Sequence, residues 1–487
     1  MLKAGKGNRT SAGLGCALLA IAVTASLQAR AQQTGGGVST PPPPIQVIQP
    51  QINNSTYEGS VAVPQVKPGV IGLSLDDAIQ MGLQHNLGLL LTSQSTQSAR
   101  GAELDQLQAL LPTVNGDIKE AEQETNLEAE GLRISGFPKI IGPYGYTDIR
   151  GSLNWSLLDL SSLQNYLAAK HDFDAAKLSV EDARQMVVLT VGNAYLRVIA
   201  DKAQIAADKA ELATARVSLN QAMDQHSAGT APKLDVLRAR VDYQTQEQTL
   251  IAAQNAFEKD KIALARAIGL PLEQKYVATE TAPFAPLDHI DQAQAVSEAL
   301  ASRQDLKALE QKVEAAKHAR KAATYERLPV IKFSGNYGDI GINVANSHGT
   351  GNAVGSLDVP IFEEPKLRGD AKQAQAQLDE EEAKLSDLRG QITQDVDDSI
   401  LDIESSAKQV QVAKSNVALA AEELKEAQER YVAGVSDNLA VSQAQQALAQ
   451  ADAQYVSSLY AHNVAKLSLA RAMGIAGRNY KTYLGGK

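Results

Sequence analysis

The chain contains one long segment twice, and this duplication constrains its fold more than any other feature of the sequence. Residues 434–475 align with residues 229–270 without a gap, and 11 of the 42 paired residues are identical. The two copies begin at Gly229 and Gly434 and end in the related heptapeptides LARAIGL and LARAMGI. Because no gap opens between the ends, the length of the segment is kept along with its composition. We therefore expect one duplicated structural unit rather than several unrelated domains.

Each half of the chain follows the same order of expected elements: helix, strand, strand, very long helix, turn and helix. A Leu-Pro pair marks the junction between the first helix and the strands in both halves, because proline ends a helix. The predicted ranges are repeat 1 at residues 73–270 with strands at about 112–120 and 146–157, a Pro-containing connector at 271–290, and repeat 2 at 291–475 with strands at about 329–341 and 352–362.

The helical patterns between these strands are long and free of proline. Residues 160–226 contain one glycine and no proline, which predicts a single helix on the order of 100 Å long. A second long helix is expected from Pro365 to about Tyr431. The shorter patterns at 78–111 and 295–328 predict one unbroken helix each.

Both ends of the chain have compositions that differ from the repeats. Residues 1–31 have the pattern of a secretory signal peptide: basic residues precede an apolar run, and Ala29-Arg30-Ala31 forms a cleavage site. Residues 32–72 are rich in Gly, Pro, Asn and Gln, which is typical of an extended linker. Residues 476–487 form a C-terminal tail.

Cysteine content, charge and histidine spacing exclude several classes of function. Cys16 is the one cysteine, so neither a disulfide framework nor a cysteine-built metal site is expected. Lipidation of Cys16 is not expected, because Gly13 stands where a lipobox has leucine. The formal net charge of −10 argues against a nucleic-acid partner. The seven histidines are scattered, and no phosphate loop or nucleophile elbow is present, so we expect no enzyme, no metal and no cofactor.

Beyond the signal region, no segment is apolar enough for a transmembrane helix, so any membrane crossing must be made by strands. Four strands cannot close a barrel, whereas three copies would give twelve strands, an even number within the range of outer-membrane barrels. Aromatic residues are scarce elsewhere but gather in or beside the predicted strands, as in an interfacial girdle; packing of a soluble hairpin is the alternative. The girdle candidates are Tyr144, Tyr146, Trp155, Phe333, Tyr337 and Phe362.

The ordered set of motifs resembles the TolC family of outer-membrane efflux proteins over residues 73–475. The matching features are the opening LSLDDAIQMGLQHNLGLLL at 73–91, the Leu-Pro junctions, the RYVAG stretch that ends at Gly434, and the glycines that close each repeat, Gly269 and Gly474. The resemblance implies a mainly α fold with a small β part: a trimeric twelve-stranded outer-membrane β-barrel continued by a periplasmic α-helical coiled-coil barrel.

The same resemblance implies function, location and partners. The protein would be the outer-membrane exit duct of a Gram-negative-type bacterium, with a large periplasmic part. It would passively export small molecules or polypeptides that an inner-membrane pump delivers through a periplasmic adaptor. Its partners would be two further copies, the adaptor, the pump and outer-membrane lipid.

Family residues are carried over to the two helix turns. The adaptor-docking residues would be Gly229, Thr230, Gly434, Val435 and Ser436. A tyrosine that helps to close the periplasmic end aligns with Tyr431, and repeat 1 has His226 there. A pair of aspartates that forms an acidic ring aligns with Ala440 and Gln443, so any ring would come from Asp235 alone. Arg238, one turn further on, would partly neutralise Asp235, and closure would depend more on packing around Tyr431.

Two other kinds of protein are the alternatives. One is a structural coiled-coil protein of the periplasm, which would not account for strand pairs inserted at matching places in both halves. The other is a periplasmic adaptor, which would carry one helical hairpin beside a lipoyl-like β domain. This chain has two expected hairpins and no such domain.

Overall fold

The computed structural model describes residues 56–61, 66, 68–132, 135–280, 284–287 and 290–477. The predicted signal peptide at 1–31 lies outside the described residues, as do most of the linker at 32–72 and the tail from residue 478 onward. All of the described residues belong to one compact unit, Gln49–Lys487.

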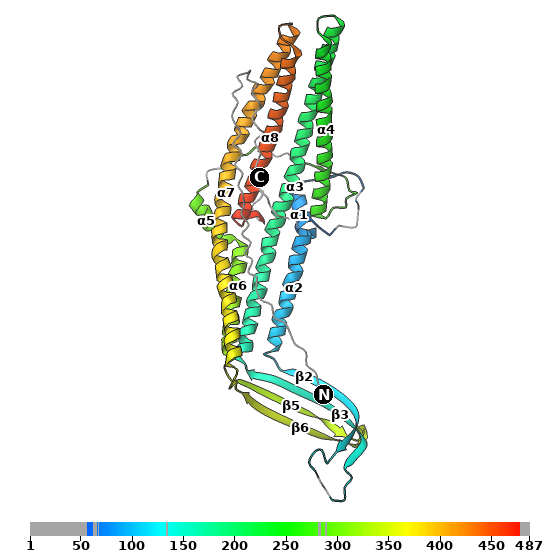
Figure 1. Ribbon diagram of the computed structural model, residues 1–487, viewed down its shortest axis with the longest axis vertical. Helices are drawn as coiled ribbons and strands as arrows, with labels where there is room; N and C mark the ends of the chain where they lie inside the picture. Colours follow the sequence, from blue (N-terminus) through cyan, green and yellow to red (C-terminus); the bar gives the residue numbers. More distant parts are fainter. Residues whose placement is uncertain are drawn as a thin grey trace, which may run out of the picture. The chain divides into compact units, whose positions relative to one another are not determined.

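The two halves repeat the same order of elements, and the prediction of a mainly α fold with a small β part is confirmed (Figure 1). The first half consists of β1 (Ile71–Leu73), α1 (Leu75–His85), α2 (Leu87–Gln108), β2 (Thr113–Asn126), β3 (Ile140–Leu158), α3 (Leu160–Ser227) and α4 (Lys233–Ile268). The second half consists of β4 (Tyr276–Ala278), α5 (Gln292–Ser302), α6 (Gln304–Tyr325), β5 (Val330–Gly341), the 3-10 turn η1 (Val344–Asn346), β6 (Ser347–Asp358), α7 (Glu364–Val432) and α8 (Asn438–Ala472).

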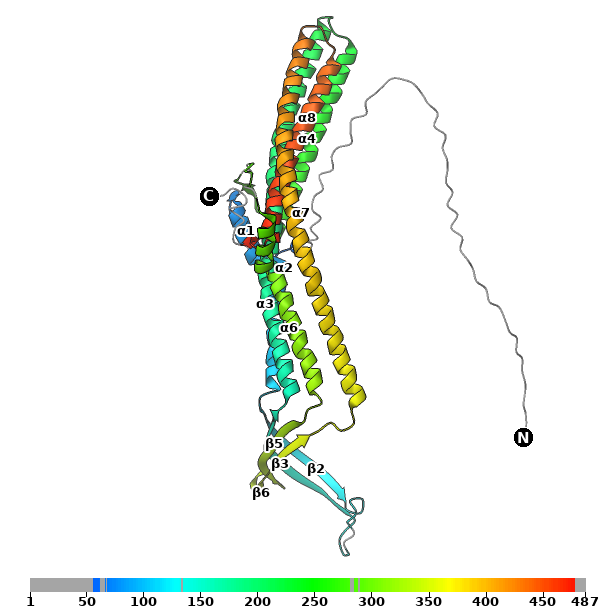
Figure 2. The same ribbon diagram turned by 90° about the vertical axis from the view of Figure 1, so that its left-hand side faces the viewer.

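The long helices α3 and α7 have 68 and 69 residues, which corresponds to about 100 Å each. Each turns back into a shorter helix, so that α3 pairs with α4 and α7 pairs with α8 (Figure 1). Helix α8 also packs against α3. Gly192 lies at this contact, where an added Cβ would come within 2.8 Å of Leu467 Cδ1. Figures 1 and 2 show the helix turns at one end of the helices and the larger sheet at the other.

The helix expected at 78–111 is interrupted, and so is the helix expected at 295–328; both predictions of one unbroken helix are wrong. The first breaks at Asn86 and the second at Arg303, where the backbone is extended. Neither site has a proline. Asn86 stabilises its break by accepting a hydrogen bond from Gly88 N at 2.9 Å, as a helix-capping residue does.

A short parallel ladder was not predicted. Strand β1 pairs with β4, with Ile71 opposite Tyr276 and Leu73 opposite Ala278. The ladder packs on the largest apolar cluster, where Tyr195 donates a hydrogen bond to the carbonyl of Leu73 at 2.8 Å. Three-residue strands carry too little periodic signal to be seen in a sequence.

The larger sheet is antiparallel with strand order β2-β3-β5-β6. Strands β2 and β3 extend beyond the predicted ranges, so the loop between them is shorter than the expected 121–145. Strand β6 begins earlier and ends earlier than the predicted 352–362. It stops at Asp358 because Pro360, two residues on, has no N–H to donate to a neighbouring strand.

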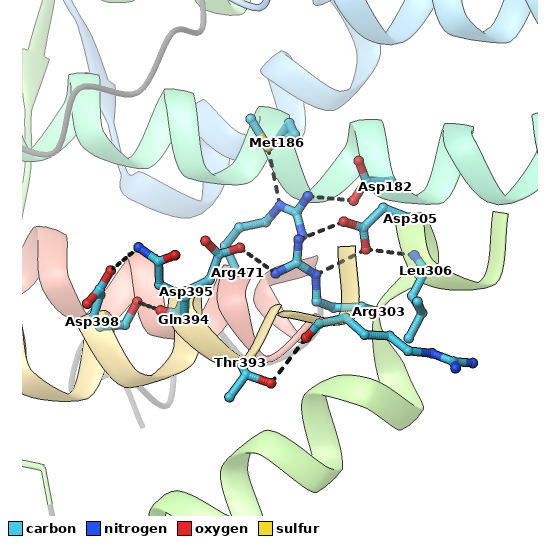
Figure 3. Close-up of polar contacts among 12 residues, drawn as sticks. Asp182, Met186, Arg303, Asp305, Leu306, Thr393, Gln394, Asp395, Asp398 and Arg471 are labelled. Atoms are coloured by element: carbon cyan, nitrogen blue, oxygen red, sulfur yellow. Dashed lines mark hydrogen bonds and ion pairs between the residues drawn. The ribbon is translucent and has the colours of Figure 1, made fainter. Parts of the chain in front are cut away.

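A buried ion cluster stabilises the break at Arg303 (Figure 3). The Arg303 side chain is 6% exposed; its Nη2 lies 2.6 Å from Asp305 Oδ2 and its Nη1 lies 2.7 Å from Asp395 Oδ2 on α7. Burial opposes ionisation of Asp305, but the hydrogen bonds from Arg303 hold its pKa below the ordinary value. Close by, Arg471 at the end of α8 pairs with Asp182 of α3 at 2.6 Å. These pairs connect α3, α6, α7 and α8 at one level.

One face of α3 carries acidic residues where a packed helix ordinarily has apolar ones. Asp201, Asp208 and Glu211 lie seven and three residues apart, on one face of the helix. Asp208 is 1% exposed, and its Oδ1 accepts a hydrogen bond from Gln204 at 2.7 Å. Burial, then the nearby Asp260, raises the pKa of Asp201 to about 7, against the effect of Arg197. Burial, then Asp208 and Asp452, raises the pKa of Glu211 to about 7.

Replacing Arg303 with alanine should strongly destabilise the fold, because two carboxylates would remain at the break without their cation. We expect a loss of about 3 kcal/mol, measured as a lower melting temperature by circular dichroism in detergent. The matched control is Arg389→Ala, which removes an exposed pair with Glu310 at 3.1 Å and should cost less than about 1 kcal/mol. Equal losses in the two variants would contradict the assigned role of the cluster.

Replacing Glu211 with glutamine should stabilise the protein at pH 8 and have little effect near pH 4. The folded-state pKa of about 7 lies above the ordinary value of 4.5, so the stabilising contribution of the protonated group is complete at acid pH and lost as the pH rises through 7. Melting temperatures of both proteins between pH 4 and 8 would measure the difference. The control is Glu247→Gln at an exposed position of α4. A constant difference across this range would contradict the prediction.

Candidate functional site

The two helix turns have the same backbone geometry. In the first, Gly229 has a φ of 75°, its N–H donates to His226 O at 3.0 Å, and Thr230 N donates to Gln225 O at 2.9 Å. In the second, Gly434 has a φ of 72°, and the matching bonds run from Gly434 to Tyr431 at 3.0 Å and from Val435 to Arg430 at 3.1 Å. This is the Schellman arrangement that ends a helix with a left-handed glycine. The sequence repeat therefore has a matching structural repeat here.

The predicted docking residues lie on the exposed surface of these turns, which we call the tips (residues 226–235 and 431–440). An added Cβ at Gly229 or Gly434 would have no neighbour within 4 Å. Val435 is 69% exposed, whereas Ser436 is half-buried. His226 is exposed, and its Nδ1 lies 2.9 Å from Ala231 O. Each tip therefore presents backbone and small side chains that another protein could approach closely.

Tyr431 is buried at the second tip. It is 5% exposed and packs with Leu424, Val441 and Ala444, which join α7 to α8. Burial, then the nearby Asp235, raises the pKa of its hydroxyl. The hydrophobic contacts fix the position of this ring.

The other predicted gate residues differ in their exposure. Asp235 is 5% exposed, so its carboxylate is largely buried within one chain, and an acidic ring built from it stays a prediction. Asp235 lies in the first turn of α4, where Asn438 of α8 donates a hydrogen bond to its carbonyl. Arg238 Nη1 lies 3.9 Å from Asp235 Oδ1, the expected i,i+3 contact. Ala440 is half-buried and Gln443 is exposed.

Sequence reasoning missed the polar contacts that join α8 to the first hairpin. Asn438, Ser442 and Gln445 follow each other at helical spacing along α8. Their side chains bond to three positions of α3 and α4: Asn438 to Asp235 O at 3.3 Å, Ser442 to Asp242, and Gln445 to Ser218 Oγ at 2.9 Å. The i, i+4, i+7 spacing of short polar residues is the signal that could have identified them.

The larger sheet has two chemically different faces, because successive residues of a strand lie on opposite sides. The register places Val114, Leu153 and Gly335 in one row and Gly116, Gly151 and Tyr337 in the next row of the same face. This apolar face is largely exposed. Its large side chains are Val114, Ile118, Ile149, Leu153, Trp155, Ile331, Phe333, Tyr337 and Leu357.

The predicted aromatic girdle divides between the two faces. Trp155, Phe333 and Tyr337 share the apolar face. Tyr144 and Tyr146 lie on the other face, and Lys119 of that face lies 5.7 Å from the centre of the Tyr146 ring. Alternation along β3 sets their side, so these two tyrosines do not share a face with the other three aromatic residues, and their place in a girdle stays a prediction. Phe362 lies beyond the end of β6 and is 91% exposed.

The opposite face of the sheet is polar. Asn115, Ser152, Asn336 and Asn352 form one row across all four strands. The Asn336 Nδ2 donates a hydrogen bond to Asn352 Oδ1 at 2.7 Å. A sheet that is apolar on one side and polar on the other fits a boundary between lipid and water.

Two absences apply to the described part of the chain. None of its helices combines the length and the apolar character needed to span a bilayer. Within the same residues, no three His, Cys, Asp or Glu side chains gather where they could hold a metal ion.

Comparison with known proteins identifies relatives of similar length. The family described as outer membrane efflux protein matches residues 79–270 and 295–475. The pyoverdine export outer membrane protein OpmQ of Pseudomonas putida is 24% identical over 450 residues, covering 90% of this chain and 94% of the relative. The toluene efflux pump outer membrane protein TtgF of Pseudomonas putida is 26% identical over 411 residues, covering 82% of each.

Solved structures share the fold. The outer membrane channel CmeC of Campylobacter jejuni superposes with a TM-score of 0.75 at 18% identity, covering 84% of this chain and 89% of that one. The outer membrane protein VceC of Vibrio cholerae gives a TM-score of 0.73 at 20% identity, covering 82% and 96%.

The family match covers both repeats and more than half of the chain, and it begins and ends close to the limits of the sequence duplication. It confirms the predicted resemblance, the location in the outer membrane with a periplasmic helical part, and the role in transport. The chain belongs to the outer membrane efflux protein family and is an outer-membrane channel for efflux.

Proposed function

We propose that three copies of this chain assemble into one exit duct, with the polar face of each sheet lining a water-filled barrel. The observation that carries the proposal is a four-stranded sheet with one apolar face, one polar face and two open edges. Strands β2 and β6 are these edges, and each has a row of backbone groups without partners in the sheet. Three such sheets joined edge to edge would form twelve strands, leaving no open edge in the bilayer.

The helices offer a second surface for other copies. On α7, Leu401, Val412 and Leu419 are 61–63% exposed and recur at spacings of eleven and seven residues, which places them in one stripe. A comparable stripe follows α4, made of Leu234, Leu237, Val241, Ile251 and Ile262. Exposed apolar stripes on water-facing helices favour a helical partner. A further copy of this chain would supply such a helical partner, because copies joined at the edges of the sheet would also place their helices side by side.

The tips support the docking of a periplasmic adaptor. They are the parts of the helices farthest from the sheet, and their glycines allow a partner helix to approach the backbone (Figure 1). An adaptor at this position would join the duct to an inner-membrane pump across the periplasm. Among the gate candidates, Tyr431 would keep the second hairpin closed through packing, while His226, Ala440 and Gln443 would line the mouth.

The relatives favour a small-molecule cargo over a polypeptide. One is named for pyoverdine export and another for toluene efflux. A purely structural coiled-coil protein would have no use for an apolar sheet face of this size.

Introducing charge into the α7 stripe should prevent assembly. Leu401→Glu with Leu419→Glu would place unpaired carboxylates in the interface between copies and remove about 1.5–3 kcal/mol of apolar burial per leucine. The trimer band on a gel of unheated samples should disappear while the helical circular dichroism signal remains. Gln409→Glu, about a quarter turn away on α7 and also exposed, is the control. An undiminished trimer band in the double variant would contradict the proposed interface.

A bulky residue at the second tip should abolish export without affecting assembly. Gly434→Trp blocks the approach of a partner, but any side chain at this positive φ is also strained. Gly434→Asn is the control, because asparagine tolerates this backbone region and remains small. Dye accumulation in cells that depend on this duct measures export. Normal export by an assembled Gly434→Trp trimer would place the docking site elsewhere.

A further inference from the structure

Charges on the polar face of the larger sheet balance, although the chain as a whole is acidic. Of the strand residues in this sheet, three acids lie on the polar face, Asp117, Asp148 and Asp358, and they are matched by three bases, Lys119, Arg150 and Lys332. Lys332 pairs with Asp358 at 2.7 Å near the helices. The other four charges lie together farther from the helices, near the middle of β2 and β3.

These four charges form a compact group, which we call the belt: Asp117, Lys119, Asp148 and Arg150. Asp117 lies opposite Arg150, and Lys119 lies opposite Asp148, so acids and bases alternate along both β2 and β3. Arg150 Nε donates a hydrogen bond to Asp148 Oδ1 at 2.7 Å, and Arg150 Nη1 donates another to Asn336 Oδ1 at 3.3 Å. The Asn336–Asn352 bond continues the network to β6.

A glycine makes room for this arrangement. Gly338 lies directly opposite Arg150 on β5, and an added Cβ there would overlap Arg150 and the carbonyl of Ile149. The guanidinium can therefore extend across β5 toward Asn336. The side chains of Arg150 and Asp148 are only 29% and 15% exposed, although this face of the sheet is open.

The opposite face shows that balance is a property of the polar side and not of the whole sheet. Its charged residues at the outer end, Glu120, Glu122 and Asp339, are all acidic. If the polar face carried acids without bases in the same way, a ring of them in a narrow pore with low-dielectric walls would concentrate cations. Paired opposite charges cancel beyond roughly one Debye length, about 10 Å at 0.1 M salt.

We infer that the belt sets the charge selectivity of the outer part of the duct, and that its balance allows cargo of either sign to pass. The inference rests on the proposed trimer, in which the polar face lines the barrel and three belts form a ring. Arg150 and Lys119 are the specificity-determining bases, because each compensates an aspartate that would otherwise face the lumen.

Single-channel recording in planar bilayers under a KCl gradient tests the inference. Arg150→Gln and Lys119→Gln should each raise the K⁺/Cl⁻ permeability ratio by at least roughly twofold, and Asp148→Asn should lower it by a similar factor. The periplasmic mouth is unchanged in all variants, so differences between them report on the barrel. Hexaamminecobalt(III) should block Arg150→Gln from one side while leaving the wild type open.

The control is Glu120→Gln, which removes a charge from the residue next to Lys119 but on the opposite face. It should leave the permeability ratio unchanged. Assembled, conducting variants with the wild-type ratio would overturn the inference while the proposed function stands. A shift of the permeability ratio in the same direction for Arg150→Gln and Asp148→Asn would also overturn the inference. Removing charges of opposite sign should move the ratio in opposite directions, whereas a change in packing need not. A wild type that forms neither trimers nor channels would refute the proposed function, and the inference with it.

Discussion

Every backbone N–H and C=O group within a lipid bilayer must find its hydrogen-bond partner inside the protein, and the architecture of this chain depends on that constraint. In the strand order β2-β3-β5-β6, the two inner strands form backbone hydrogen bonds with a neighbour on both sides. The edge strands β2 and β6 each have a neighbour on one side only. In the proposed trimer, further copies would supply the partners that one chain alone lacks. Each repeat contributes one hairpin, and the strand order makes the ends of this short sheet available for joining to further copies.

The helical part lies in water rather than in lipid, so polar side chains can pack between its helices. Acids occupy one face of α3, and short polar residues join α8 to the first hairpin. Each hydrogen bond of this kind contributes only about 0.5–1.5 kcal/mol to stability. Two close charge pairs with little-exposed arginines lie at the level of Arg303 and Arg471, where four helices meet (Figure 3).

Sequence periodicity and the placement of proline and glycine predicted the long helices, the turns and the existence of the strands, because these features are local. The helix breaks were not predictable in this way. Asn86 and Arg303 both bind partners that are distant in sequence, Ala267 for Asn86 and Asp395 for Arg303. The side of Tyr146 and the burial of Asp235 depend on strand register and on the position of α8. Residue type alone predicts neither the side of Tyr146 nor the burial of Asp235.

The two breaks show how far the repeats have diverged in chemistry, although the helices on either side of each break keep the same lengths, 11 and 22 residues. Sequence alignment of the halves places Asn86 opposite Arg303, and both have the same extended backbone between two helices. Asn86 is neutral and binds backbone groups, including Ala267 O at the end of α4. Arg303 is charged and needs two carboxylates, one of them on α7. The break of the first half is thus joined to its shorter helix α4, whereas the break of the second half is joined by charge to its long helix α7. The two breaks therefore share a backbone geometry but differ in the strength of the bonds that they make. A hydrogen bond between charged groups, as at Arg303, is stronger than one between neutral groups, as at Asn86.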